Sequence, residues 1–218
     1  DRKATITIIC SISIMILSFL FINIPMFAEA KALEDAETVF FNQGDAYRKL
    51  GEYRRAINEY DKCIKINPKN SEAYTNRGAA NIELGNLKQA IKDLDKAIEI
   101  DQKSADTYYN RGIAYFNLGN YNRAIKDYDR AIKINPKASN FYTNRGNAYF
   151  GRSDQKRAIK DYDKAIEINP QNAQAYNNRG NAYGSLGDKD QAIKDIKIAA
   201  KLGLKKAQDF LQQYGVDK

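Results

Sequence analysis

Residues 105–138 read ADTYYNRGIAYFNLGNYNRAIKDYDRAIKINPKA, and a similar pattern returns along the chain every 34 residues. The glycine at the eighth position of this stretch marks the period most clearly. It recurs at equal spacing as Gly44, Gly78, Gly112, Gly146 and Gly180. A fixed period of this length is typical of a solenoid, in which stacked supersecondary units share one continuous core. We therefore expect an extended surface rather than an enclosed active site.

The quoted stretch predicts two helices joined by a short turn. Its apolar residues between 108 and 116 follow the spacing of one helical face. Residues 118–121, LGNY, interrupt that pattern, and their glycine suits a helix C-terminal cap. A second apolar stripe with helical period runs from Ala124 to Ile132. Asn135-Pro136 then predicts the end of the second helix, because the residue before proline avoids the α region.

Other positions recur in step with the glycines. Alanine stands twelve residues after each of them, as Ala56, Ala90, Ala124, Ala158 and Ala192. A small residue follows seven positions later, and three repeats then carry proline at 68, 136 and 170. This pattern resembles the tetratricopeptide repeat, a helix–turn–helix unit of 34 residues. The resemblance implies an all-α fold, a right-handed α-solenoid with repeats at residues 37–70, 71–104, 105–138, 139–172 and 173–206.

The two ends of the repeat array also have predictable features. Residues 205–214 predict a capping helix that buries Ala207, Phe210, Leu211 and Tyr214, with Gly215 ending it. At the other end, residues 32–37 are expected to extend the first helix, so that the repeat domain covers residues 31–218. The fourth repeat has Gly151-Arg152-Ser153-Asp154 at its inter-helix turn, which predicts a looser turn without a break in the stack.

Residues 1–30 have a different composition from the repeats. A basic pair, Arg2 and Lys3, precedes a mostly apolar run over residues 4–24, and Ala28-Glu29-Ala30 follows. This layout is typical of a signal peptide cleaved after Ala30. The apolar run is also long enough for an uncleaved membrane anchor. Both interpretations predict export, to a periplasm, a lumen or the extracellular space.

The residue types exclude several kinds of chemistry. The chain has no histidine and no tryptophan, which excludes histidine general bases and imidazole metal sites. We find no phosphate-binding loop, no calcium loop and no nucleophile–base arrangement, so we expect no catalytic residues, no metal and no cofactor. Cys63 occupies a column that holds alanine elsewhere and is expected to be a packed core residue. The acidic side chains of the second helices are expected to form a solvated, charge-mixed face: Asp93, Asp95, Asp127, Asp129, Asp161 and Asp163.

The charge balance favours acidic partners. The formal net charge is +8, and residues 1–30 are neutral overall, so the excess lies in the repeats. A basic surface attracts acidic proteins or anionic headgroups. Lysines alternate with aspartates instead of forming a stripe, which argues against nucleic acid.

A column of asparagines is the sharpest candidate site. Asparagine stands two residues before every repeat glycine, as Asn42, Asn76, Asn110, Asn144 and Asn178. The resemblance implies that this column faces the concave groove, where similar asparagines bind the backbone of an extended peptide. An amide side chain offers donors and an acceptor to any peptide unit. The other residues expected to line this peptide-binding groove are Asn147, Asn181, Thr75, Tyr109, Thr143, Asn177, Phe116 and Phe150.

Two alternatives remain open for this column and its neighbours. The asparagines are ordinary in the family the chain resembles, so five copies also fit repeat duplication without a ligand. The arginines that follow them, at 77, 111, 145 and 179, are expected to pair with aspartates on adjacent helices. The cations that clamp a C-terminal carboxylate in some similar proteins are missing from the matching columns, which argues against that mode.

The function that the sequence favours is a non-catalytic scaffold that binds a protein segment outside the cytoplasm. One alternative is a self-assembling subunit of a filament or envelope layer, because open solenoid ends allow heterologous contacts. The other is an accessory subunit of a larger complex, held at a membrane by residues 4–24.

Overall fold

The computed structural model describes residue 29 and residues 31–214, which are built from helices joined by short turns. The expected signal or anchor segment and the expected stop at Gly215 lie outside the described residues. The chain forms two compact units, the first ending at Ala73 and the second beginning at Tyr74. The boundary falls inside helix α3 (Ser71–Glu83).

The first unit is a helical pair. A helix over residues 31–49 precedes α2 (Tyr53–Ile66), which confirms the predicted extension of the first helix. Ala56, Tyr60 and Cys63 of α2 have no exposed surface. Burial raises the pKa of the Cys63 thiol to about 11, so the side chain is a packed core residue, as predicted.

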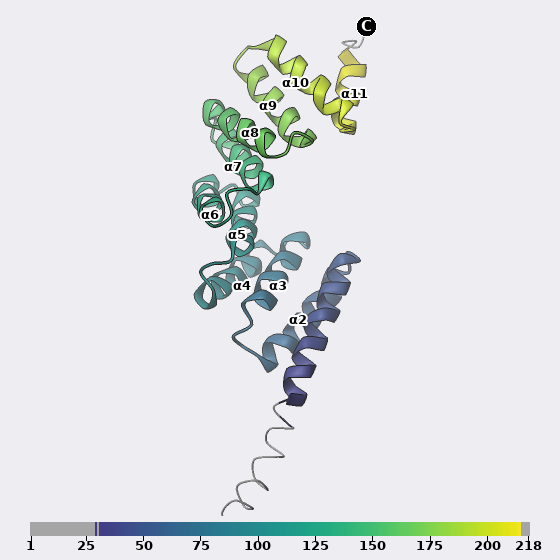
Figure 1. Cartoon of the computed structure of the whole chain (residues 1–218), viewed down its shortest axis with the longest axis vertical. Helices are drawn as coiled ribbons and strands as arrows, with labels where there is room; N and C mark the ends of the chain where they lie inside the picture. Colours follow the sequence, from purple (N-terminus) through teal and green to yellow (C-terminus); the bar gives the residue numbers. More distant parts are fainter. Residues whose placement is uncertain (1–28, 30, 215–218) are drawn as a thin grey trace, which may run out of the picture. The chain divides into compact units, whose positions relative to one another are not determined.

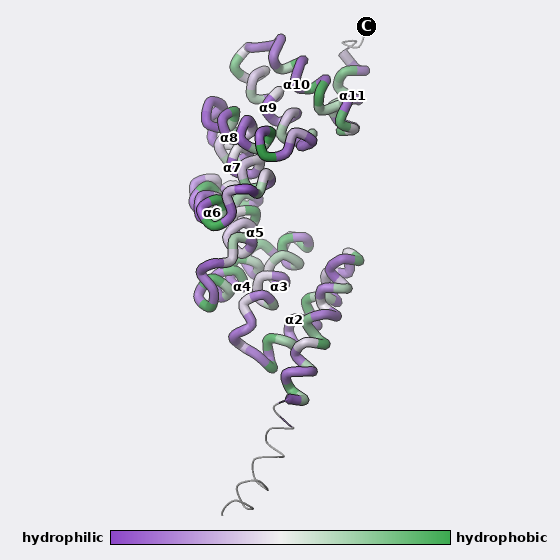
Figure 2. The backbone as a smooth tube through the Cα atoms, in the orientation of Figure 1, coloured by the Kyte–Doolittle hydropathy of each residue, from purple (hydrophilic) through white to green (hydrophobic). Residues whose placement is uncertain are grey.

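The second unit continues the helix–turn–helix pattern. Its helices after α3 are α4 (Leu87–Ile100), α5 (Ala105–Asn117), α6 (Tyr121–Ile134), α7 (Ser139–Gly151), α8 (Gln155–Ile168), α9 (Ala173–Ser185), α10 (Lys189–Lys201) and α11 (Lys205–Tyr214). From α4 onward, each helix packs against the next one along the chain (Figure 1). Hydrophobic and hydrophilic residues alternate along these helices, as one buried stripe per helix requires (Figure 2). The all-α solenoid of helix–turn–helix repeats is confirmed.

The repeat glycines allow a side chain of the second helix to lie directly against the backbone of the first. A Cβ atom at Gly112 would lie 2.5 Å from Cε1 of Tyr128, and one at Gly146 would lie 2.6 Å from Cε1 of Tyr162. Both tyrosine rings are buried, with only 1% of their surface exposed. A helical glycine costs about 1 kcal/mol against alanine. Close contact with a buried ring explains why the sequence places one there.

The inter-helix turns use a left-handed residue at a fixed place. Gly119 has φ 73°, and Ser153 has φ 58° at the same position one repeat later. The Ser153 turn keeps the backbone hydrogen bonds of the Gly119 turn: Ser153 N–H donates to Phe150 O at 2.9 Å, as Gly119 N–H does to Phe116 O at 2.8 Å. The expectation of a looser turn in the fourth repeat is therefore wrong. Serine adopts the left-handed conformation there, with a steric cost that glycine avoids.

Buried ion pairs connect neighbouring helices of the second unit. Arg145 of α7 donates from Nε and Nη2 to both carboxylate oxygens of Asp161 on α8, and from Nη1 to Asp129 on α6. The same geometry recurs around Arg111 and around Arg179. The predicted pairing of these arginines with aspartates on adjacent helices is confirmed.

The expected solvated acidic face is wrong for half of its members. Asp93, Asp127 and Asp161 are buried against arginines, whereas the outer partners Asp129 and Asp163 keep half of their side-chain surface exposed. Burial raises the pKa of the Asp127 and Asp161 carboxyls, and the facing arginines counteract that shift. The physical reason is that each bidentate arginine satisfies a carboxylate that would otherwise need water.

The final helix, α11, has the predicted bounds but not the predicted packing. Ala207 and Leu211 are buried against α10, as expected. Phe210 is 38% exposed and Tyr214 is 63% exposed, so the prediction that both are buried is wrong. Ala207 and Leu211 face α10, and the two rings instead pack against each other, with centroids 4.7 Å apart and ring planes tilted by 39°. Within residues 29 and 31–214, no helix combines the length and hydropathy needed to cross a bilayer.

Candidate functional site

The first helices of the repeats carry the asparagine column. Asn110, Asn144 and Asn178 lie on α5, α7 and α9 and are half-buried, as is Asn76 on α3. Asn42, in the first unit, is exposed. Each of the three helices α5, α7 and α9 therefore presents its asparagine at the same point of the repeat.

Hydrogen bonds connect three asparagines into a row across α7 and α9. Asn178 Nδ2 donates to Asn147 Oδ1 at 2.7 Å, and Asn147 Nδ2 donates to Asn144 Oδ1 at 3.4 Å. Asn144 Nδ2 in turn donates to the Tyr109 hydroxyl of α5 at 2.7 Å. We call Asn144, Asn147 and Asn178 the amide row. It lies along adjacent helices of the stack, as a ligand crossing several repeats requires.

Two further side chains fix the orientation of the row. The Tyr162 hydroxyl donates to Asn147 Oδ1 at 2.9 Å, and Gln174 Nε2 donates to Asn178 Oδ1. Neither residue belongs to the predicted site. Tyr162 was visible in the sequence as one of three tyrosines that stand sixteen residues after a repeat glycine, with Tyr60 and Tyr128, and Gln174 stands one helical turn before Asn178.

The amide row is only partly satisfied. An asparagine amide has two N–H donors. Among the contacts of the described residues, each member of the row uses one N–H, and a second remains on Asn144, Asn147 and Asn178. The exposed Asn181 side chain makes no hydrogen bond within this part of the chain. The row therefore offers donors to an acceptor arriving from solvent.

A cavity of 490 Å³ opens over two members of the row, Asn147 and Asn178, and Asn144 lies outside its lining. Five predicted site residues line it together: Phe116, Asn147, Phe150, Asn178 and Asn181. The remaining lining comes from Tyr121, Gly151, Tyr162 and Gln174. Phe116 packs on Tyr121 with ring centroids 5.4 Å apart. The cavity thus combines amides with half-buried aromatic rings.

Three predicted residues of the same helices lie below this surface. Thr75 is buried with its hydroxyl 2.8 Å from that of Thr107. Thr143 is buried, donates to Ser139 O and accepts from Asn172 Nδ2. Asn177 is also buried. The two threonines connect neighbouring elements, whereas Asn177 donates from Nδ2 to Asn178 Oδ1 at 3.4 Å on its own helix. Because all three side chains are buried, we leave them out of the candidate surface. Tyr109 remains half-buried beside it, and burial raises the pKa of its hydroxyl.

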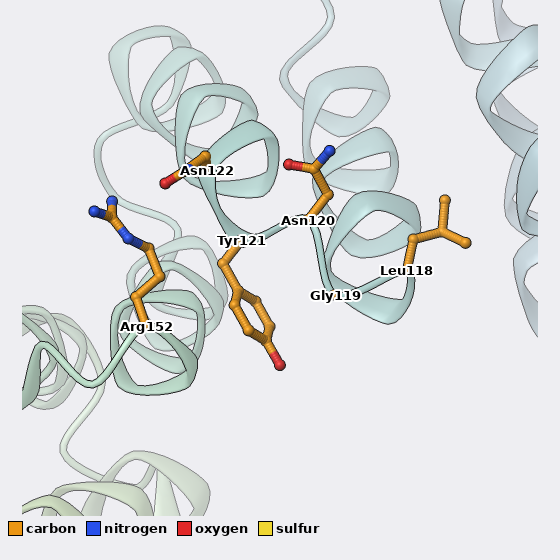
Figure 3. Close-up of a pocket in the computed structure, with 6 residues that line it drawn as sticks. All are labelled: Leu118, Gly119, Asn120, Tyr121, Asn122 and Arg152. Atoms are coloured by element: carbon orange, nitrogen blue, oxygen red, sulfur yellow. The ribbon is translucent and has the colours of Figure 1, made fainter.

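A second cavity, of 380 Å³, lies at the turn between α5 and α6. Figure 3 shows Arg152, at the end of α7, beside Tyr121 and Asn122 at the start of α6. Tyr121 also lines the cavity over the amide row, but no predicted site residue lines the turn cavity. We therefore place the candidate site at the amide row.

Comparison with protein families agrees with this architecture. A profile described as TPR repeat matches residues 44–85, 81–119 and 146–187, and profiles described as tetratricopeptide repeat match residues 105–138 and 173–202. The chain belongs to the tetratricopeptide repeat family. It is a protein-binding scaffold of this family, whose members are typically non-catalytic.

Solved structures of this family resemble the chain over most of its length. A crystal structure of MamA is 32% identical, with 80% of this chain and 96% of that chain covered and a TM-score of 0.68. MamA from Desulfovibrio magneticus RS-1 is 18% identical over 80% of this chain and 98% of that chain, with a TM-score of 0.70. YrrB, described as a TPR protein with an unusual peptide-binding site, is 20% identical over 75% and 84%, with a TM-score of 0.62. The last two show the fold alone. The comparison with curated proteins gave no match.

Proposed function

We propose that this tetratricopeptide repeat protein binds an extended polypeptide segment along the amide row. The observation that carries the proposal is the set of unused N–H groups on Asn144, Asn147 and Asn178. These donors suit peptide carbonyl groups, which every residue of an extended segment presents whatever its side chain. YrrB, described as having a peptide-binding site, supports this class of ligand.

The network around the row favours binding because it prepares the donors in advance. Tyr162 and Gln174 hold the amide oxygens by donating to them, which directs the amide nitrogens of Asn147 and Asn178 outward or along the row. A ligand then loses less affinity to side-chain ordering. Phe116 and Phe150 line the same cavity as Asn147 and Asn178 and supply apolar contact area there.

The arginines beside the row do not take part in recognition. Arg145 and Arg179 each donate once from Nε, Nη1 and Nη2 to buried and outer aspartates, and these ion pairs hold the guanidinium groups in place. Specificity at the row itself therefore comes from neutral amides and rings.

The test uses the full chain and a degenerate peptide pool. The probe is a set of fluorescein-labelled nonapeptides with one fixed phenylalanine at the centre and a mixture of Gly, Ser, Asp and Glu elsewhere. Fluorescence anisotropy gives the apparent Kd for wild type and for the double variant Asn144→Ala/Asn178→Ala. Loss of two hydrogen bonds predicts an apparent Kd about tenfold or more higher in the variant.

The matched control removes two amides outside the row. Asn117 and Asn122 are exposed and lie at the end of α5 and the start of α6. The variant Asn117→Ala/Asn122→Ala is expected to bind as wild type does. Equal Kd values for both double variants, with circular dichroism unchanged, would contradict recognition through the amide row.

We further propose that the protein acts outside the cytoplasm, supported by the composition of residues 1–30. N-terminal sequencing of the protein purified from fractionated source cells tests this. A mature chain beginning at Lys31 in the exported fraction supports cleavage, whereas an intact chain extracted only with detergent supports the anchor. Intact chain in the cytosolic fraction contradicts both.

A further inference from the structure

A phenylalanine stands four residues after the repeat glycine in two successive repeats, and the next repeat lacks it. Phe116 and Phe150 occupy this column, and the position 34 residues further on is Gly184. In the structure, Phe116 packs against a cluster that contains Ala124, Ile125 and Tyr128. The chain therefore fills this place in the third repeat with its own aromatic ring.

Phe150 fills the equivalent place in the fourth repeat. It packs with Ala158, Tyr162 and Ile159, which are the same columns of the second helix one repeat later. The receiving surface for the ring is thus built the same way twice, from an alanine, an isoleucine and a tyrosine at fixed positions.

The last repeat has the receiving surface but no ring to fill it. Ala192, Ile193 and Ile196 of α10 occupy the same three columns. A Cβ atom at Gly184 would contact only the Ala192 Cβ, at 3.7 Å, which is ordinary van der Waals distance. Ile196 is also smaller than the tyrosines of the preceding repeats, which enlarges the space further.

A cavity of 790 Å³ is the result. Ala192, Ile193 and Ile196 line it together with Phe150 from α7 and with Phe210 and Tyr214 from α11, the two rings that the cap leaves exposed. A cavity of about 150 Å³ with apolar lining suffices to hold a benzene molecule. The space is therefore ample for one aromatic side chain.

We propose that this cavity receives an aromatic side chain of the bound polypeptide segment, at the place where the third and fourth repeats carry their own phenylalanine. The inference rests on the proposed function and adds a specificity-determining subsite to it. Phe150 and Asn181 line both this cavity and the one over the amide row, so a segment bound along the row continues directly into it.

Of the residues that line the cavity, the one with a charged side chain is a lysine, and the helices that carry the lining are basic, which favours acidic neighbours for that aromatic residue. Lys189 lines the cavity. Residues 189–214 of α10 and α11 contain six lysines against three aspartates, and one of those aspartates, Asp195, is buried in a salt bridge with Arg179. The occupant is therefore the aromatic side chain of an acidic extended segment.

The test compares peptide pools that differ in one residue. The probes are the acidic nonapeptide pools with Phe or with Ala fixed at the centre, and a third pool with Phe at the centre but Lys and Arg in place of Asp and Glu. For the full wild-type chain we expect the Phe pool to bind at least about tenfold more tightly than the Ala pool. We expect the basic pool to bind more weakly than the acidic one.

The decisive variant is Gly184→Phe, which supplies the ring from within. It is expected to fold with a Tm no lower than that of wild type and to bind the Phe and Ala pools equally. The matched control is Leu186→Phe, which adds a ring at an exposed turn position outside the cavity lining. This control is expected to keep the preference for phenylalanine.

Each outcome separates the subsite from the amide row. Wild type binding the Phe and Ala pools alike, with Asn144→Ala/Asn178→Ala weakening both, overturns the subsite and leaves the proposed function. A preference that Gly184→Phe abolishes but the double variant does not affect supports the subsite and overturns the row. Binding of no pool overturns both. Light scattering that shows a wild-type dimer and a monomeric Gly184→Phe variant would assign the cavity to a second copy and overturn the subsite.

Discussion

Arg145 allows the energy of a buried ion pair to be compared with that of an exposed one on the same side chain. It donates two hydrogen bonds to Asp161, at 2.8 Å and 2.6 Å, and one to Asp129, at 2.7 Å. The Asp161 side chain is 8% exposed and the Asp129 side chain is 50% exposed, while that of Arg145 is 20% exposed. The perturbations are Asp161→Asn and Asp129→Asn, which keep the shape of each side chain and remove its charge.

The two substitutions are expected to lower the free energy of unfolding by amounts that differ several-fold. Removing one partner of a buried pair costs about 3–5 kcal/mol. Because Arg145 keeps Asp129 and some contact with water, we expect the lower end, about 3 kcal/mol, for Asp161→Asn. An exposed pair contributes about 0.5 kcal/mol, which is the expectation for Asp129→Asn. For a chain of this size these changes lower Tm by about 6–12 °C and about 1–2 °C respectively.

The assay is thermal unfolding followed by circular dichroism at 222 nm, with urea unfolding as an independent measure of stability. Both variants are compared with wild type at the same concentration and salt. The Tm of Asp161→Asn must be well below the Tm of Asp129→Asn. Equal Tm values for the two variants would refute the argument that burial of the Asp161 carboxylate sets the energy of this contact.

Three further predictions concern packing, the backbone and a thiol. Gly146→Ala places a Cβ 2.6 Å from the buried ring of Tyr162, so we expect it to destabilise the chain by about 2 kcal/mol despite the better helix propensity of alanine. An unchanged or higher urea midpoint would contradict this. Ser153→Gly relieves the left-handed φ of 58°, so Tm should rise with a gain of about 0.5–1 kcal/mol, and a fall would disprove strain at the turn. In a Cys10→Ala background Cys63 is the single thiol, and because burial raises its pKa to about 11, iodoacetamide at pH 8 should label it only after unfolding. Rapid labelling of the folded protein would contradict this, because it would show an accessible thiolate.

The sequence predicted the helices well because their signals are local and repeated. The turn glycines, the Asn-Pro helix stop and the apolar stripes each depend on a few neighbouring residues. The same signals return every 34 residues, so each repeat supports the interpretation of the others. The capping helix, residues 205–214, was therefore predicted with its observed bounds. Its packing was not, because the apolar stripe of α11 is wider than the single helix that covers it, which leaves Phe210 and Tyr214 exposed.

The errors at charged and polar positions have a different cause. Asp127 and Asp161 look like surface residues in a lysine-rich helix, and their burial depends on an arginine sixteen residues earlier on another helix. The pairing itself was predicted, but no local pattern shows which aspartates it buries. The burial of Thr143 was missed for a similar reason, because its hydroxyl bonds to Ser139 O and to Asn172 Nδ2, and the second partner lies 29 residues away in the sequence.

The asparagine column was visible as a site because its period is that of the fold. Hydrogen-bond partners of Asn144, Asn147 and Asn178 were not visible, because they depend on how adjacent helices pack. The same limit applied to the cavity beside Gly184. The aligned repeats show plainly that position 184 lacks an aromatic ring. Only the structure shows that α11 contributes apolar side chains to the lining of the cavity.

The central claim is that the amide row donates hydrogen bonds to a bound peptide, and nuclear magnetic resonance of side-chain amides tests it most directly. Spectra of full-length ¹⁵N-labelled protein would be recorded during titration with the acidic pool that carries a central phenylalanine. The Nδ2 signals would be assigned by single Asn→Ala variants. We predict saturable downfield shifts for Asn144, Asn147 and Asn178, with the signals of Asn117 and Asn122 unchanged. Saturable peptide binding that leaves the three signals of the row in place would contradict the account.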